Sequence, residues 1–158
     1  MIKIIIVQKL IERYKARLAT AEESLSSANK AVNEAPSAMQ SGSDTTRYQM
    51  TGTANNIGNI VDVLIDSIKI MSQFQDIPCR IGKPGSVISL VRNGVEEHYF
   101  LIPDQAEGGE EIVVDGNIYC CINQRSPLGA SLIGKIESDE FSFGIPGNAS
   151  VLFIKRIQ

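Results

Sequence analysis

The stretch SAMQSGSDTTRYQM, Ser37–Met50, separates two long runs of helical periodicity and decides how the N-terminal half folds. It is small and polar, and Asp44 is its single carboxylate. Pro36, immediately before it, ends a helix because proline lacks the amide proton that a helix needs. Asp44 or Ser43 is suited to cap a second helix. We therefore expect a tip at about residues 36–46 between two helices.

Both flanking runs carry apolar residues at alternating steps of three and four, which places them on one side of a helix. The members of the first run are Ile4, Val7, Ile11, Tyr14, Leu18, Ala21, Leu25, Ala28, Val32 and Ala35, and those of the second are Met50, Ala54, Ile57, Val61, Leu64, Ile68 and Met71. Each helix spans about 45 Å at about 1.5 Å per residue. Matched lengths around one break favour an antiparallel coiled-coil hairpin within one chain, hence a monomer, over a dimerising coiled coil. Small residues near the tip predict a narrow far end.

The C-terminal half has the period of strands. Three strand pairs are predicted around the turn signals Asn93-Gly94, Asp115-Gly116 and Pro146-Gly147-Asn148. In RSPLGASLIGK, Ser126 suits the N-cap of a short helix, Pro127 its first turn and Gly134 its C′ position. The pattern predicts an antiparallel sheet of five or six strands with one short helix. The whole chain is therefore expected to be α+β.

A change of composition marks the boundary between the halves. QDIPCRIGKPG contains two prolines and two glycines, which are typical of a linker. We expect a helical hairpin over residues 1–76, a linker over 77–81 and a second domain over 82–158.

Composition narrows the function classes. The 158 residues are 43% hydrophobic and 21% charged with a formal net charge of -3, as in a soluble globular protein. No broad basic surface is expected, which argues against direct capture of duplex nucleic acid. The N-terminal apolar run is too short for a membrane span, which needs about 20 residues. We expect a cytoplasmic protein with no membrane association.

Cysteine and histidine offer little for a metal site. Cys79, Cys120 and Cys121 include no CxxC pair, and His98 is the single histidine. Adjacent Cys120 and Cys121 should point to opposite faces of a strand, so we expect reduced thiols. His98 has no nucleophile or pair of carboxylates beside it in the sequence, so a strand position is favoured over catalysis.

The segment SPLGASLIGKIESDEFSFGIPG, Ser126–Gly147, resembles the motif S-P-x-x-x-x-L-(I/L)-G-K, acidic turn, strand, P-G of the GreA/GreB transcript elongation factors. GSVISLV and VEEHYFLI are similar to the opening strands of that family's C-terminal domain. The resemblance covers about residues 82–158 by motif. For residues 1–76 it rests on the hairpin architecture.

The resemblance implies an FKBP-like C-terminal domain and a bacterial RNA polymerase partner. The globular domain would dock outside the polymerase secondary channel, and the tip would reach toward the active centre to modulate elongation or transcript cleavage. Nucleic acid would be met only indirectly, through the transcription complex. The chain would not be an enzyme itself and would have no cofactor of its own, because Mg²⁺ would be held only within the polymerase active centre.

The tip departs from the family pattern, which reads roughly G-D-x-x-E-N-A-E-Y. Asp44 stands at or near the aspartate, and Arg47 stands where the glutamate would be. Glu34 on the opposite helix is the other carboxylate nearby. Cleavage stimulation by this family would need a second Mg²⁺ in the polymerase active centre, and such an ion prefers several oxygen ligands. A tip with a single carboxylate therefore favours a polymerase-binding regulator over a cleavage factor. Asp44 could cap the second helix, lie near the metal, or do both at once, and it could also pair with Arg47.

Alternative functions stay open. Ser126, Pro127 and Leu128 match the family loop expected to contact the polymerase, or they cap and pack the short helix. A Gre homologue that blocks the channel or modulates initiation is one alternative. A peptidyl-prolyl isomerase and a generic coiled-coil adaptor are the others.

Overall fold

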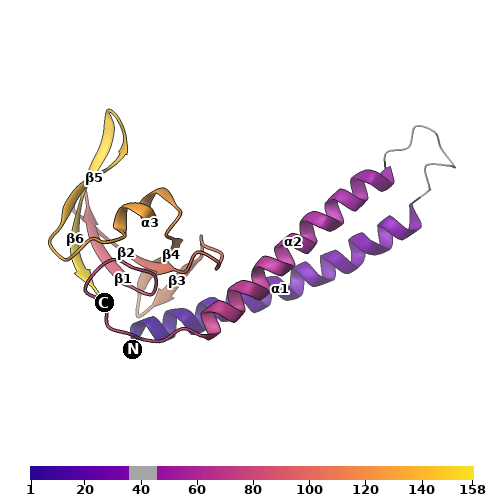
Figure 1. Ribbon diagram of the computed structural model, residues 1–158, viewed down its shortest axis with the longest axis horizontal. Coiled ribbons are helices and arrows are strands. Elements are labelled where there is room, and N and C mark those ends of the chain that lie inside the picture. The colour runs from indigo at the N-terminus through magenta and orange to yellow at the C-terminus, as the bar shows by residue number, and fades with distance from the viewer. Residues whose placement is uncertain (36–45) are drawn as a thin grey trace.

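The computed structural model describes residues 1–35 and 46–158. Helix α1 (Ile2–Glu34) and helix α2 (Thr46–Ser72) lie side by side and project away from a sheet as one long arm (Figure 1). The antiparallel hairpin predicted from the two apolar runs is confirmed. Ala28 of α1 and Met50 of α2 line the same hollow near the far end, and Ile11 and Ile68 pack against the same core near the base.

The apolar runs form the seam of the hairpin with one exception. Every described member is buried or half-buried except Ile4, which is 44% exposed. Near the base, Lys3, Ile6 and Leu10 are buried although they lie outside the run. The first turns of α1 therefore bury a second side, because they pack against the sheet as well as against α2.

The C-terminal half is a six-stranded sheet that carries one short helix, α3 (Pro127–Leu132). The strand order is β3-β4-β2-β1-β6-β5. The strands are β1 (Val87–Arg92), β2 (Val95–Ile102), β3 (Glu111–Val114), β4 (Asn117–Asn123), β5 (Glu140–Ile145) and β6 (Asn148–Ile157). The α+β class is confirmed.

All three predicted turns join paired strands, and the third consists of Pro146 and Gly147 alone because Asn148 belongs to β6 and pairs with Ile145. Asn93 and Gly94 have φ of 51° and 80°, and Asp115 and Gly116 have 49° and 80°. Positive φ at both central residues is the signature of a type I′ turn, which asparagine, aspartate and glycine tolerate best. Each of these turns closes a two-residue hairpin.

One pairing differs from the antiparallel sheet expected from the sequence. Strands β2 and β4 run parallel, with Phe100 opposite Cys121. After β2 the chain passes over residues 103–110 to the sheet edge, where β3 begins. The β3–β4 hairpin then folds back into the vacant place beside β2, so β4 runs in the direction of β2. The sheet is therefore mixed.

Each face of the sheet has its own core. The base of the hairpin covers one face, and the members of this core include Ile6, Leu10, Tyr14, Leu64, Met71, Val87, Phe100, Ile112 and Tyr119. Helix α3 and the segment after α2 cover the other, whose members include Cys79, Ile88, Leu90, Leu101, Leu132, Leu152 and Ile154. The arm and the sheet thus share a hydrophobic core. Full burial of one such aliphatic side chain contributes about 1.5–3 kcal/mol.

Candidate functional site

The far end of the hairpin carries two of the three tip residues named from the sequence. Glu34 ends α1 and Arg47 lies in the first turn of α2, and both side chains are exposed. Neither forms an ion pair within residues 1–35 and 46–158. Asp44, and with it the expected cap or its pairing with Arg47, lies outside the described residues.

A hollow separates the two helices close to this end. Its volume is about 320 Å³, and it is lined by Ala28, Ala31, Thr46, Gln49, Met50 and Thr53. Small side chains on α1 leave this space unfilled. The close helix approach that small seam residues predict stays a prediction.

The loop before α3 contains the three residues expected to contact a partner. Ser126 caps the helix, because its Oγ accepts a hydrogen bond from the Gly129 amide at 3.1 Å and donates one to the Asn123 carbonyl at 2.7 Å. Leu128 is half-buried against the core. Pro127 is exposed at the first helical position. Capping and packing thus account for Ser126 and Leu128, and Pro127 is free to contact another molecule.

Gly129 is a residue that sequence reasoning missed. A Cβ atom on it would lie 2.1 Å from the Asn123 carbonyl oxygen. The Asn123 side chain meanwhile donates to the Asp104 carbonyl at 2.9 Å. Asn123 therefore contacts both the start of helix α3, next to Pro127, and the loop over residues 103–110.

That loop is where the arm is joined to the sheet, and we call it the junction loop. The Tyr14 hydroxyl of α1 donates to the Glu107 carbonyl oxygen, and the Ser67 hydroxyl of α2 accepts from the Glu107 amide at 2.8 Å. Both backbone groups of one residue are therefore bound by the two helices of the arm. Tyr14 is completely buried, and this burial, chiefly, raises the pKa of its hydroxyl well above the usual range.

Ion pairs surround these hydrogen bonds. Arg17 lies 2.8 Å from a Glu107 carboxylate oxygen and 2.9 Å from one of Glu110, and Arg13 lies 3.2 Å from Glu110. The hydrogen bond to Glu107, more than any other contact, raises the pKa of the Arg17 guanidinium. Because both guanidinium groups are about half exposed, each pair contributes at most about 1 kcal/mol. We expect these pairs to affect the direction in which the arm leaves the sheet more than the stability of the fold.

Sequence reasoning did not identify the junction. Its signal was present as two arginines one helical turn apart, Arg13 and Arg17, and as the acidic residues Glu107 and Glu110. What the sequence lacked was any indication that these segments, about 90 residues apart, meet.

His98, Cys120 and Cys121 occupy structural positions on the sheet. His98 Nδ1 lies 2.9 Å from the Ser89 hydroxyl, and its ring stacks on Tyr119 at 5.2 Å between centroids. Cys120 is half-buried and Cys121 buried on β4, and burial raises the pKa of the Cys121 thiol to about 12. Among the residues that the structure describes, no three His, Cys, Asp or Glu side chains gather in a way that would hold a metal ion.

Within the same residues, neither long helix has an apolar stretch sufficient to cross a membrane.

Comparisons with known proteins return solved structures alone. No protein-family model matches the chain, and no curated protein matches it. GreA factor homolog 1 (Gfh1) of Thermus thermophilus is 22% identical over 94% of each chain with a TM-score of 0.37. Thermus aquaticus Gfh1 is 20% identical over 92% of each chain with a TM-score of 0.36.

A prokaryotic transcription elongation factor GreA/GreB from Nitrosomonas europaea is 17% identical, with a TM-score of 0.37, over 60% of this chain and 78% of the other. Similarities of this size assign no function to the chain.

Proposed function

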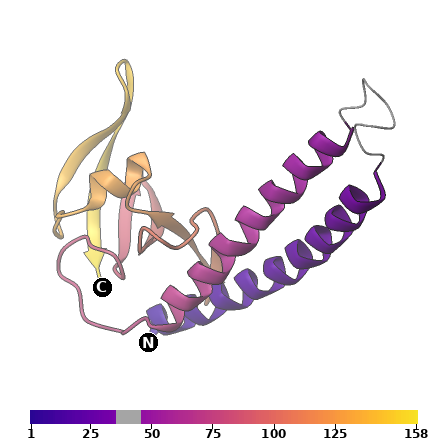
Figure 2. The same cartoon turned by 45° about the vertical axis from the view of Figure 1, so that its right-hand side comes forward.

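We propose that this chain is a Gre-like transcription factor that binds bacterial RNA polymerase as a monomer and places its hairpin tip in the secondary channel. The observation that carries the proposal is the conjunction of the Ser126–Gly147 motif with a long two-helix arm on the same chain. The motif resembles the GreA/GreB factors, and an arm of 33 residues reaches about 50 Å at about 1.5 Å per residue. Such an arm extends far beyond the sheet that would dock (Figure 2).

The junction supports this use of the arm. An arm that enters a channel must have a fixed orientation relative to the domain that docks. Tyr14, Ser67 and Arg17 hold the base of the arm to one loop of the sheet half. Helix α3 and Pro127 belong to the same half of the chain. If the sheet half docked through Pro127, the junction loop would therefore fix the position of the tip.

We propose a regulatory effect without strong cleavage stimulation. The tip offers Asp44 with Arg47 three residues later, where a divalent cation would prefer a second carboxylate. The polymerase would have to supply the remaining ligands itself. Modulation of elongation, blocking of the channel and modulation of initiation are effects that such a tip would allow.

Retention on immobilised bacterial core RNA polymerase at low salt tests the partner. We expect the wild-type chain to be retained and Pro127→Glu to be retained at least tenfold less, with an unchanged urea midpoint because Pro127 is exposed. Glu140→Lys, a charge change at an exposed position of strand β5, is the control. Absence of retention of the wild-type chain would refute the proposal.

A transcript-cleavage assay on stalled elongation complexes tests the effect. We expect weak or no stimulation by the wild type and a gain with Arg47→Glu, which restores a carboxylate. Stimulation by the wild type that survives Asp44→Ala would contradict any metal role for Asp44.

A further inference from the structure

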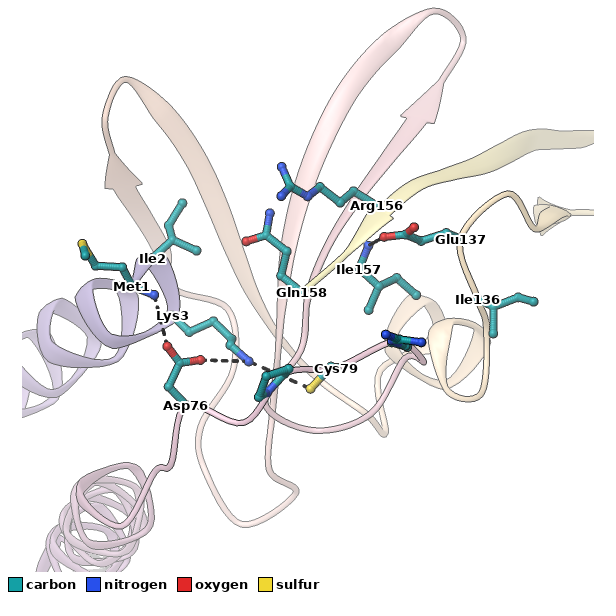
Figure 3. Close-up of a pocket in the computed structure, with 12 residues that line it drawn as sticks. Met1, Ile2, Lys3, Asp76, Cys79, Ile136, Glu137, Arg156, Ile157 and Gln158 are labelled. Atoms are coloured by element: carbon teal, nitrogen blue, oxygen red, sulfur yellow. Dashed lines mark hydrogen bonds and ion pairs between the residues drawn. The ribbon is translucent and has the colours of Figure 1, made fainter.

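A buried lysine and a buried cysteine lie in contact where the arm meets the sheet. Lys3, in the first turn of α1, is 4% exposed, and Cys79, in the segment between α2 and β1, is 6% exposed. Lys3 Nζ lies 4.0 Å from Cys79 Sγ. Figure 3 shows the lysine side chain extending from α1 to a position between Asp76 and Cys79. We call these two residues the Lys3–Cys79 pair.

The surroundings hold the two groups in place. Lys3 Nζ donates to the Ile77 carbonyl at 2.5 Å and lies 3.0 Å from an Asp76 carboxylate oxygen. The Cys79 thiol donates to the same Ile77 carbonyl at 3.3 Å. The Lys3 nitrogen and the Cys79 sulfur are therefore both hydrogen-bonded to one backbone oxygen, beside the Asp76 carboxylate.

Small molecules have access to the pair in spite of its burial. Cys79 and Lys3 line a hollow of about 950 Å³ between the first turn of α1, the segment after α2 and the end of β6. Cys79 also lines a second hollow of about 360 Å³ with Phe74 and Pro103. Cys121 by contrast is 1% exposed.

We propose that the Lys3–Cys79 pair is a site of oxidative modification, at which hydrogen peroxide joins Cys79 Sγ to Lys3 Nζ through one bridging oxygen atom. Cysteine thiols are oxidised by peroxide to sulfenic acids, which condense with nearby groups. Lys3 Nζ and Cys79 Sγ are 4.0 Å apart. To form an S–O–N bridge, the two side chains would have to move together by less than to form a direct S–N bond, because the oxygen atom occupies part of the gap.

The reaction balances with two molecules of peroxide. The first breaks its O–O bond, gives the thiol one oxygen to form S–OH, and leaves as water. The ammonium of Lys3 loses one proton to water, and the free amine then loses two electrons to the second peroxide as the N–O bond forms on the sulfenic oxygen. Two water molecules leave in this second step. Sulfur and nitrogen each lose two electrons.

The bridge would close the base of the arm covalently. Lys3 and Cys79 are 76 residues apart in the sequence, so the link would tie the start of α1 to the segment that leads into β1. Oxidation would thus fix the arm to the sheet independently of the Arg17 ion pairs. This inference does not depend on the proposed function.

Peptide mapping of the full chain tests the proposal. The chain contains three cysteines. After treatment with hydrogen peroxide, we expect free thiols to fall from three to two. A peptide joining residue 3 to residue 79 should appear, with one oxygen more and two hydrogens fewer than the sum of its parts. Dithiothreitol should remove it and restore the third thiol.

Matched variants identify the atoms. Lys3→Arg and Cys79→Ser should abolish the joined peptide, whereas Lys9→Arg, on the same helix, should retain it. If a variant fails to fold, the presence or absence of the joined peptide in the wild-type chain decides the proposal. Wild-type Cys79 recovered only as free thiol or as sulfinic acid would overturn the proposal, and so would a joined peptide without the extra oxygen.

Discussion

At the residue scale, Tyr14 links the seam of the hairpin to the sheet. It belongs to the apolar run of α1, and its hydroxyl reaches the Glu107 carbonyl. The run predicted that Tyr14 would be buried, which is confirmed. The run could not predict the hydrogen bond. Heptad spacing shows which side of a helix is buried, but it does not show which distant segment contacts that side.

We expect Tyr14→Phe to lower the free energy of unfolding by about 1–2 kcal/mol, because it leaves the Glu107 carbonyl without its partner. Urea denaturation measures the change. Tyr48→Phe is the matched control, since Tyr48 is 84% exposed and its change should have no effect. Equal stability of the Tyr14 and Tyr48 variants would contradict the role assigned to Tyr14.

The same hydroxyl predicts a loss of stability in alkali. The pKa of Tyr14 is higher in the folded chain than in the unfolded chain. Its contribution is therefore complete below the ordinary tyrosine pKa of about 10 and is lost progressively as the pH rises above it. We expect the unfolding free energy to fall as the pH rises through about 10 and beyond, and Tyr14→Phe to reduce that slope. An identical slope in both proteins would count against a buried, neutral Tyr14.

At the element scale, local signals determined most of what could be predicted. Turn residues, caps and apolar periods act over a few neighbouring residues, so the hairpin, the two type I′ turns and helix α3 could be identified from the sequence. The parallel pairing of β2 with β4 could not, because it depends on where the chain returns after residues 103–110. The place of β6 beside β1 is non-local in the same way.

Two glycines with open surroundings should respond to substitution in opposite directions. A Cβ atom added to Gly52 in α2 or to Gly94 in the first turn would have no atom within 4 Å, but Gly94 has a φ of 80°. We expect Gly52→Ala to raise the unfolding free energy by about 0.5–1 kcal/mol through helix propensity. Gly94→Ala should lower it by about 1–2 kcal/mol through strain. Thermal unfolding of both variants checks the signs, and a shared sign would contradict the assigned conformations.

At the scale of the whole molecule, the arm and the sheet share a hydrophobic core and one junction loop. The sequence predicted both units and the order in which they occur. The sequence did not predict how the two units are attached. Ile6 and Leu10 lie outside the apolar run, and their burial is explained only by the sheet that packs against them. The division at residues 76 and 82 stays a prediction, as do the roles of Asp44 and Pro127.

A charge swap tests whether the junction ion pairs orient the arm. Arg17→Glu should lower stability by about 1 kcal/mol or less, because the guanidinium is 42% exposed. It should also broaden the distribution of distances between spin labels at Glu12 and Glu140, two exposed positions on the arm and the sheet. Adding Glu110→Arg should restore the narrow distribution. Unchanged distances in Arg17→Glu would show that the core alone sets the direction of the arm.

Site-specific photocrosslinking decides whether the tip enters the polymerase. A photoreactive residue at position 47 lies at the tip, and one at position 12 lies near the base of the same arm. With bacterial core RNA polymerase, we expect crosslinks from position 47 to polymerase segments that line the secondary channel near the active centre, and none of these from position 12. Binding without any crosslink from position 47 to the channel, or the same crosslinks from both positions, would contradict the proposed function.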